Sequence, residues 1–144
     1  MYNNIFNEDD MIKFQTYLKK QNKTITCAES CTGGLISSMI TEISGSSAIF
    51  KGSIITYCNE IKEQELNVDK NIMIKYGVVS IEVVRQMCQG ALKKFHSNYA
   101  IAVSGIAGPN GATKNKPVGT VVIGVINDKG DENIRVYNLQ GDRK

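Results

Sequence analysis

The segment of this sequence best suited to chemistry is Thr26-Cys27-Ala28-Glu29-Ser30-Cys31-Thr32-Gly33-Gly34, in which a serine and two glycines follow a short apolar run. The apolar pattern predicts a strand over residues 25–28 and a helix over residues 33–43. A tight turn between a strand and a helix can expose a serine oxygen and leave backbone N–H groups free for a developing oxyanion. The same residues are also typical of a turn in which Ser30 or Thr32 only caps the helix and the glycines allow close packing.

A serine nucleophile needs a base, and the sequence offers a histidine and a lysine. The single histidine, His96, lies near the end of a predicted helix, far in sequence from the polar loops, and we expect it to be exposed. Lys62 lies one helical turn beyond Tyr57. A lysine can activate a serine when burial lowers its pKa from about 10.4 toward roughly 7–8. The alternative interpretation of Lys62 is an ordinary surface lysine in solvent.

The elements that must position these side chains alternate along the chain. The expected helices cover residues 9–20, 33–43 and 59–66, and a long helix follows Ser80, which caps it. A brief helical turn capped by Asp69 is expected to reach residue 76. The expected strands cover residues 25–28, 53–57, 99–103 and 120–126, with an exposed edge strand at 134–137 joined through a hairpin turn. We therefore expect one domain over residues 1–144, a three-layer α/β/α sandwich with a mixed, mostly parallel central sheet.

Polar residues follow three of the predicted strands. Ser30 follows the first, Tyr57 ends the second, and Ser104 follows the continuous apolar run at 99–103. Ligands of open α/β sheets bind outside the carboxyl ends of the strands, so we expect these loops to converge where the strands are parallel and adjacent. The segment Gly141-Asp142-Arg143 adds a basic residue near the end of the chain.

The composition excludes several classes of protein. The 42% hydrophobic and 22% charged residues are typical of a soluble globular domain, and the net charge of +3 is too small and scattered to predict a nucleic-acid partner. No apolar stretch approaches the ~20 residues of a membrane span, and residues 1–10 are polar, so we expect no membrane contact, no signal peptide and a cytoplasmic location. The cysteines lack metal-site spacing, so we expect free thiols and no metal site; they are Cys27, Cys31, Cys58 and Cys88.

The motifs taken together resemble the C-terminal domain of CinA proteins, the nicotinamide-nucleotide amidase family. The resemblance runs from about residue 24 to residue 143 in the order of the family. It rests on Ala28-Glu29-Ser30-Cys31-Thr32-Gly33-Gly34, Gly45-Ser46-Ser47, Tyr57-Cys58-Asn59-Glu60-x-Lys62, Gly77-x-Val79-Ser80, Ser104-Gly105-Ile106-Ala107-Gly108-Pro109, Lys116-Pro117-Val118-Gly119-Thr120 and Gly141-Asp142-Arg143.

This resemblance implies hydrolysis of nicotinamide mononucleotide to nicotinic acid mononucleotide and ammonia, a step of pyridine-nucleotide salvage. It implies a small-molecule nucleotide substrate and no metal or other cofactor. By the same resemblance, Ser30 is the nucleophile of a Ser–Lys mechanism and Lys62 is its general base. Tyr57 and Ser47 are hydrogen-bonding partners in that relay, and Ser104 matches a hydroxyl position that is often Thr.

Two further roles complete the expected site. Arg143 matches a basic residue of the family, and we expect it near the substrate phosphate, which the paired donors of a guanidinium suit. From the geometry of helix ends alone, we expect the backbone N–H groups of Cys31, Thr32 and Gly33 to form the oxyanion hole.

The sequence departs from the family pattern in two ways. Cys58 stands where the family usually has Ser, and the sequence ends at Lys144, where the family normally continues into a C-terminal helix. The amino-terminal nucleotide-binding domain of longer CinA proteins is also absent. We expect part of the sheet to be left uncovered and a homo-oligomer, a dimer or higher, to cover it. Two alternatives stay open: a nucleotide-binding or interaction module of the same fold with weakened turnover, and an amidase or esterase acting on another small substrate.

Overall fold

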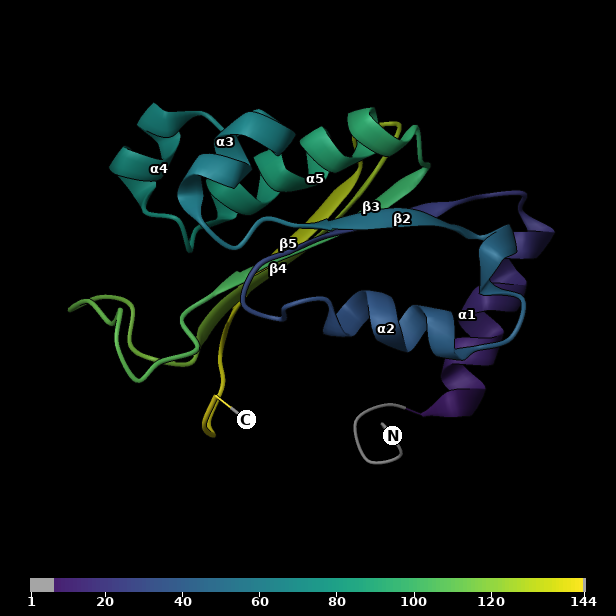
Figure 1. Cartoon of the computed structure of the whole chain (residues 1–144), viewed down its shortest axis with the longest axis horizontal. Helices are drawn as coiled ribbons and strands as arrows, with labels where there is room; N and C mark the ends of the chain where they lie inside the picture. The colour runs from purple at the N-terminus through teal and green to yellow at the C-terminus, as the bar shows by residue number, and fades with distance from the viewer. Residues whose placement is uncertain (1–6, 144) are drawn as a thin grey trace.

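The computed structural model describes residues 7–143 and contains one five-stranded sheet with helices on both faces (Figure 1). The strand order is β2-β1-β3-β4-β5. The strands are β1 (Ile25–Glu29), β2 (Phe50–Ile55), β3 (Tyr99–Gly105), β4 (Thr120–Asn127) and β5 (Glu132–Asn138). β1 is parallel to β2 and β3, whereas β4 is antiparallel to both β3 and β5. The expected mixed sheet is confirmed. All strands except β4 run in the same direction, but only the two pairs made by β1 are parallel, because β4 lies between β3 and β5 and is antiparallel to both.

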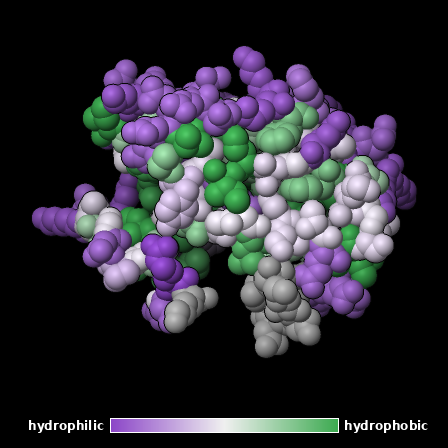
Figure 2. Space-filling model, in the orientation of Figure 1, coloured by the Kyte–Doolittle hydropathy of each residue, from purple (hydrophilic) through white to green (hydrophobic). Residues whose placement is uncertain are grey.

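The helices form two layers that sandwich the sheet. Figure 1 shows α3 (Asn59–Leu66), α4 (Lys70–Tyr76) and α5 (Ile81–Phe95) on one face, and α1 (Glu8–Lys20) and α2 (Leu35–Glu42) on the other. Figure 2 shows hydrophilic side chains along the outer surface of α3 to α5, at the top of the view, and more hydrophobic side chains between this surface and the lower layer. The three-layer α/β/α sandwich expected from the sequence is confirmed.

Each face of the sheet has its own apolar core. One core packs buried residues of α5, such as Val84 and Met87, against Ala28 of β1 and Ala102 of β3. The other packs Leu18 of α1 and Ile40 of α2 against the opposite face of β1. Because successive strand residues point to opposite faces, β1 contributes to both cores, and all five of its residues are buried.

The predicted helix caps are present in the structure. The Asp69 carboxylate accepts a hydrogen bond from the N–H of Asn71 at 2.7 Å, at the start of α4. The Ser80 hydroxyl accepts one from the N–H of Val83 at 3.3 Å, at the start of α5. α3 also occupies the predicted residues Asn59–Leu66. These elements are local in origin, since a short polar side chain at the first position satisfies otherwise unpaired N–H groups.

Several boundaries near the polar residues differ from the prediction. β3 continues to Gly105, so Ser104 lies inside the strand rather than after it. β2 begins at Phe50 and ends at Ile55, so Tyr57 lies beyond the strand rather than at its end. Gly52, which weakens the strand pattern in the sequence, lies inside β2 with φ 142. α2 begins at Leu35, because Gly33 and Gly34 have φ values of 59 and 102, outside the right-handed helical region.

Part of one sheet face carries exposed apolar side chains. On β4, Val122 and Gly124 face α5, so Val121, Ile123 and Val125 point to the opposite face. Val125 is 38% exposed, and Tyr137 of β5, which pairs with Val121, is 39% exposed. The homo-oligomer expected to cover this face stays a prediction.

The position of α3 depends on a glycine in α5. A Cβ atom built at Gly90 would lie 2.2 Å from the carbonyl oxygen of Leu66, the last residue of α3. Only a residue without a side chain permits this approach, so Gly90 sets how closely α3 packs on α5. Lys62 lies on α3, and the approach therefore also sets the depth of Lys62.

Gly90→Ala should destabilise the fold, although alanine favours a helix by about 1 kcal/mol over glycine. Overpacking usually costs about 1–3 kcal/mol, and the obstructing atom here is backbone, so relief requires a shift of α3 itself. Urea unfolding of the variant, with Gln89→Ala at an exposed neighbouring position as control, measures the effect. A Gly90→Ala protein as stable as the control would show that α3 tolerates the shift.

Candidate active site

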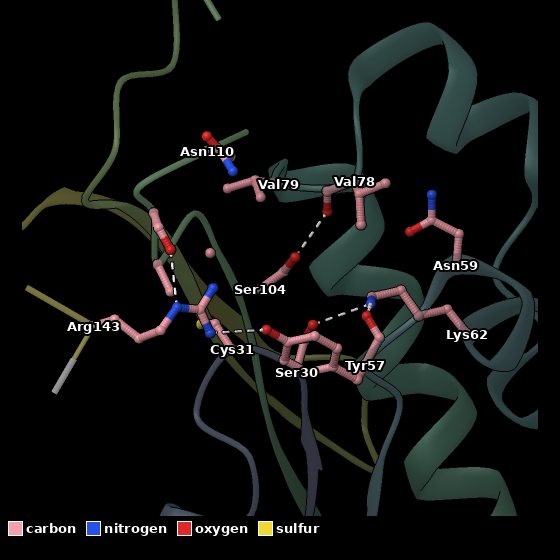
Figure 3. Close-up of a pocket in the computed structure, with 13 residues that line it drawn as sticks. Ser30, Cys31, Tyr57, Asn59, Lys62, Val78, Val79, Ser104, Asn110 and Arg143 are labelled. Atoms are coloured by element: carbon pink, nitrogen blue, oxygen red, sulfur yellow. Dashed lines mark hydrogen bonds between the residues drawn. The ribbon is translucent and has the colours of Figure 1, made fainter. Parts of the chain in front are cut away.

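A cavity of about 230 Å³ opens at the carboxyl ends of β1, β2 and β3 (Figure 3). Its wall comes from the turn after β1, the start of α3, the residues before α5, the loop after β3 and the end of the chain. The lining residues are Ser30, Cys31, Tyr57, Asn59, Lys62, Val78, Val79, Ser104, Gly105, Ala107, Gly108, Asn110 and Arg143. The polar loops expected to converge therefore do so, and the lining carries no carboxylate within the part of the chain described.

Ser30 and Lys62 form a hydrogen-bonded pair inside this cavity. The Nζ atom of Lys62 lies 3.1 Å from the Oγ atom of Ser30, as the dashed line in Figure 3 shows. Lys62 is 1% exposed and Ser30 is 7% exposed. The interpretation of Lys62 as a solvent-exposed surface lysine is therefore wrong.

Two backbone carbonyl groups hold the Lys62 amine in place. Nζ donates to the carbonyl oxygen of Thr56 at 2.6 Å and to that of Tyr57 at 3.2 Å. Burial lowers the pKa of Lys62 from its ordinary value, and the nearby Cys58 and Cys31 thiols oppose this effect. A neutral amine has two N–H bonds and one lone pair. In the neutral form, with both N–H bonds directed to the carbonyls, the lone pair would face the Ser30 hydroxyl, which is the arrangement that proton transfer from serine requires.

The side chain of Tyr57 contacts Arg143 rather than Lys62. Arg143 donates from Nη1 to the Tyr57 hydroxyl at 3.2 Å and from Nε to the carbonyl oxygen of Gly108 at 2.9 Å. The backbone carbonyl of Tyr57 therefore contacts Lys62, and the hydroxyl of Tyr57 positions the Arg143 guanidinium. Ser104 lies in the same cavity, where its hydroxyl donates to the carbonyl oxygen of Val78 at 3.0 Å.

The three residues expected to form the oxyanion hole have different surroundings. The N–H of Gly33 donates to the carbonyl oxygen of Ser30 at 3.0 Å, so it is used within the turn. The Thr32 hydroxyl donates to Glu29 at 2.7 Å and does not line the cavity. Cys31 lines the cavity, and burial raises the pKa of its thiol, which favours the neutral form. Of the three expected residues, only Cys31 lines the cavity, so its N–H group remains the candidate for the oxyanion hole.

Ser47 is a predicted site residue that the structure does not bring to the cavity. It is exposed and lies in the short 3-10 helix η1 (Ser46–Ala48), which precedes β2. β1 and β2 are parallel, so a residue before β2 lies at the opposite end of the sheet from Ser30, which follows β1. At about 3.3 Å per residue, the length of β2 separates the two ends by roughly 15–20 Å. Within one chain, the expected relay therefore does not include Ser47.

Several lining residues were not identified from the sequence as site residues. Asn59 is the first residue of α3, and its place in the same short run as Tyr57 and Lys62 was an available signal. Val79 belongs to the family motif Gly77-x-Val79-Ser80, which was also an available signal. Val78 gave none, because its contact with the cavity depends on how the segment before α5 packs against the end of β3.

The remaining expectations about thiols, histidine and metals have simple outcomes. All four cysteines are free, and His96 is exposed at the end of α5, both as predicted. Across residues 7–143, no group of three or more His, Cys, Asp or Glu side chains could hold a metal ion. Within the same residues, no helix is long and apolar enough to cross a membrane.

An α/β sandwich with polar loops gathered at the carboxyl ends of its parallel strands defines the class of ligand-binding α/β proteins. Comparison with known proteins assigns the family. The model of the CinA C-terminal domain matches residues 9–144, and the chain belongs to this family.

Relatives agree with this assignment. The CinA-like protein of Fervidobacterium nodosum is 54% identical over 127 residues, which are 88% of this chain and 31% of that protein. The crystal structure of the competence/damage inducible protein CihA from Agrobacterium tumefaciens superposes with a TM-score of 0.89 at 36% identity, covering 92% of this chain and 81% of that one. The competence damage-inducible protein A of Klebsiella pneumoniae gives a TM-score of 0.89 at 28% identity, covering 94% of this chain and 83% of that one. The chain thus spans less than a third of the Fervidobacterium relative and most of the solved structures.

Lys62→Met should change how stability depends on pH. The folded state lowers the pKa of Lys62, so between that value and the ordinary 10.5 the unfolded chain holds a proton that the folded chain has lost. Stability contributed by this group therefore rises with pH through that window. The variant lacks this rise, and urea unfolding from pH 7 to 10 should show the wild type gaining stability relative to it.

The difference between the two proteins isolates Lys62 from other titrating groups. The buried Cys27 and Cys88 thiols have pKa values raised to about 12, and both proteins contain them, so their effect cancels. A stability difference that stays constant across this pH range would contradict the lowered pKa of Lys62.

Proposed function

We propose that this domain hydrolyses the amide of nicotinamide mononucleotide, yielding nicotinic acid mononucleotide and ammonia, with Ser30 as nucleophile and Lys62 as general base. The observation that carries the proposal is the buried Lys62 amine, 3.1 Å from the Ser30 hydroxyl. The similarity of the sequence motifs to nicotinamide-nucleotide amidases supplies the substrate. Membership of the CinA C-terminal domain family is consistent with it.

The first half of the reaction forms an acyl-enzyme. Lys62 takes the hydroxyl proton as Ser30 Oγ attacks the amide carbonyl carbon, and the carbonyl oxygen becomes a tetrahedral oxyanion. The N–H group of Cys31, which lines the cavity, is the donor we assign to that oxyanion. The resulting Lys62 ammonium then gives its proton to the amide nitrogen. The C–N bond breaks, ammonia leaves, and an ester joins the nicotinoyl group to Ser30.

The second half uses the same two residues: Lys62 is again the base, and the Ser30 oxygen is now the leaving group. Lys62, again neutral, takes a proton from a water molecule that attacks the ester carbonyl carbon. The tetrahedral intermediate collapses, the Ser30 oxygen leaves with the proton returned by Lys62, and the carboxylate product is released. One water is consumed and one ammonia is formed for each amide, with no change in oxidation state.

Charge and space at the cavity suit an anionic substrate. Among the described residues, Lys62 and Arg143 are the side chains of the lining that can carry a charge, and both charges are positive. Arg143 also lines an adjoining hollow of about 410 Å³, which shares Ala107 with the first cavity. The nicotinamide ring would lie beside Ser30, and the ribose phosphate would extend past Arg143 into this hollow. A guanidinium there would pair with the phosphate oxygens.

Ser30→Ala should abolish turnover while the fold is retained. Removal of the nucleophile in serine hydrolases lowers the rate by roughly 10³-fold or more, and a serine-to-alanine change at this site leaves the apolar cores intact. Ammonia release from nicotinamide mononucleotide measures the effect. Thr16→Ala, which removes a hydroxyl from the exposed face of α1, is the matched control.

The same assay separates the competing functions. Ammonia release by Ser30→Ala at close to the wild-type rate would overturn the role of Ser30. A wild-type protein that binds the nucleotide without releasing ammonia would favour the binding-module alternative. Release of acid from another small amide or ester, but not from nicotinamide mononucleotide, would favour the alternative substrate.

Lys62→Arg should be inactive, because a guanidinium stays protonated and cannot accept the serine proton. In the wild type the rate should rise with pH through an apparent pKa below that of free lysine, since burial lowers the pKa of Lys62. The measurement is the pH–rate profile, with Lys51→Arg at an exposed position of β2 as control. Substantial activity in Lys62→Arg would rule out the base role.

A further inference from the structure

Glu29 is a fully buried carboxylate that the mechanism above does not use. It is the last residue of β1, is 0% exposed, and directly precedes Ser30. Alternation along the strand directs the two neighbours to opposite faces of the sheet. Ser30 faces the layer of α3, where Lys62 lies, and Glu29 faces the layer of α2.

Five hydrogen bonds surround this carboxylate, and all of their donors belong to residues 32–37. The Oε1 atom accepts from the Thr32 hydroxyl at 2.7 Å and from the N–H groups of Gly34 and Ile36 at 3.2 and 3.0 Å. The Oε2 atom accepts from the N–H of Ser37 at 3.0 Å and from its hydroxyl. Three of the five partners are backbone N–H groups, which can only donate, so both oxygens of Glu29 act as acceptors.

This arrangement caps α2 from a neighbouring strand. The capping position itself is Gly34, which has no side chain to offer the first N–H groups of the helix. Glu29 satisfies them instead, and the partial positive charge of the helix end offsets the buried negative charge. These N–H groups therefore point away from the cavity, so the start of α2 does not bind the substrate anion.

The backbone of Glu29 ties the turn to the other half of the Ser–Lys pair. Its carbonyl oxygen accepts from the N–H of Thr56 at 2.8 Å. The carbonyl of Thr56 is in turn the closest acceptor of the Lys62 amine. A second link runs through the Ser37 and Ser53 hydroxyls, 2.6 Å apart, from the carboxylate to β2. One residue is thus bonded both to the turn that carries Ser30 and to the segment that holds Lys62.

We propose that Glu29 is a positioning residue, which holds the turn at residues 30–35 so that the Ser30 oxygen lies within reach of Lys62. The turn contains Gly33 and Gly34, whose backbone conformations cost little to change, so the turn itself does not fix the serine. The five bonds to Glu29 supply the constraint. The proposal rests on the role of Ser30 in the proposed function, and it deepens that role.

Glu29→Gln is the sharpest test, because it keeps the size of the side chain and changes its donors. The new NH₂ group would face backbone N–H groups that now donate to the carboxylate. It cannot accept from them, so those hydrogen bonds would be lost and that part of the turn would no longer be held. We expect kcat for ammonia release to fall roughly 10²-fold, the effect of a misplacement of about 1 Å. KM should change little, because Arg143 and Ser104 are not bonded to Glu29.

A second measurement follows Ser30 without the nucleotide. The rate at which a fluorophosphonate labels Ser30 should fall in Glu29→Gln in parallel with kcat. Leu18→Ala, which removes a buried side chain of α1, serves as the control for loss of stability alone and should be labelled at the wild-type rate below its melting temperature. Ser37→Ala keeps the carboxylate and removes one of its five partners, so it should show a several-fold fall even where Glu29→Gln fails to fold.

The outcomes separate this proposal from the proposed function. A wild type that is labelled at Ser30 but releases no ammonia from nicotinamide mononucleotide would overturn the assigned substrate, and the labelling rates would still decide the role of Glu29. Unchanged labelling and kcat in Ser37→Ala and Glu29→Gln would overturn the positioning role. A loss in the Glu29 and Ser37 variants that Leu18→Ala shares equally would also overturn it, because the effect would then be general destabilisation.

Discussion

The burial of the Lys62 amine is the constraint on which the rest of the site depends. A lysine that is 1% exposed is tolerated because its N–H bonds find carbonyl acceptors in Thr56 and Tyr57. Those carbonyls are available because β2 ends at Ile55, and the chain then leaves the sheet. The depth of the amine depends in turn on α3, which Gly90 allows to approach α5. The burial of the Lys62 amine therefore requires the end of β2, the loop that follows it and the contact between α3 and α5.

β1 distributes two functions between the two faces of the sheet. Ala28 faces α5, and Ser30, two residues further on, points to the same side. Ile25 and Cys27 face α1 and α2, and Glu29 points to that side. The buried Glu29 carboxyl group and the Ser30 hydroxyl, the proposed nucleophile, can thus be consecutive in sequence without competing for the same partners. Both layers of helices are needed, because α3 supplies Lys62, the proposed base, on one face and α2 supplies hydrogen-bond donors to Glu29 on the other.

The elements and the serine turn could be predicted from the sequence, because these depend on local patterns. The capping residues Asp69 and Ser80 and the alternation of apolar runs are examples. Lys62 was a candidate from its spacing to Tyr57, and its role came from the family resemblance. The burial of Lys62 could not be predicted from residues 59–66, where its neighbours are mostly polar, since it depends on packing against distant segments. Ser47 was assigned to the relay by the family resemblance alone, and parallel pairing of β1 and β2 puts it at the other end of the sheet from Ser30.

The contacts of Glu29 affect which groups are free to bind an anionic substrate. In many α/β proteins the N–H groups at the start of a helix bind the anion, but here those of Gly34, Ile36 and Ser37 already bind a carboxylate of the protein. A neutral Lys62 contributes no charge in the state that accepts the serine proton. In the proposed function, attraction for the anionic substrate would therefore fall to Arg143, whose guanidinium is held by the Tyr57 hydroxyl and the Gly108 carbonyl. This division would keep the cation proposed to bind the phosphate separate from the amine proposed to act as the base.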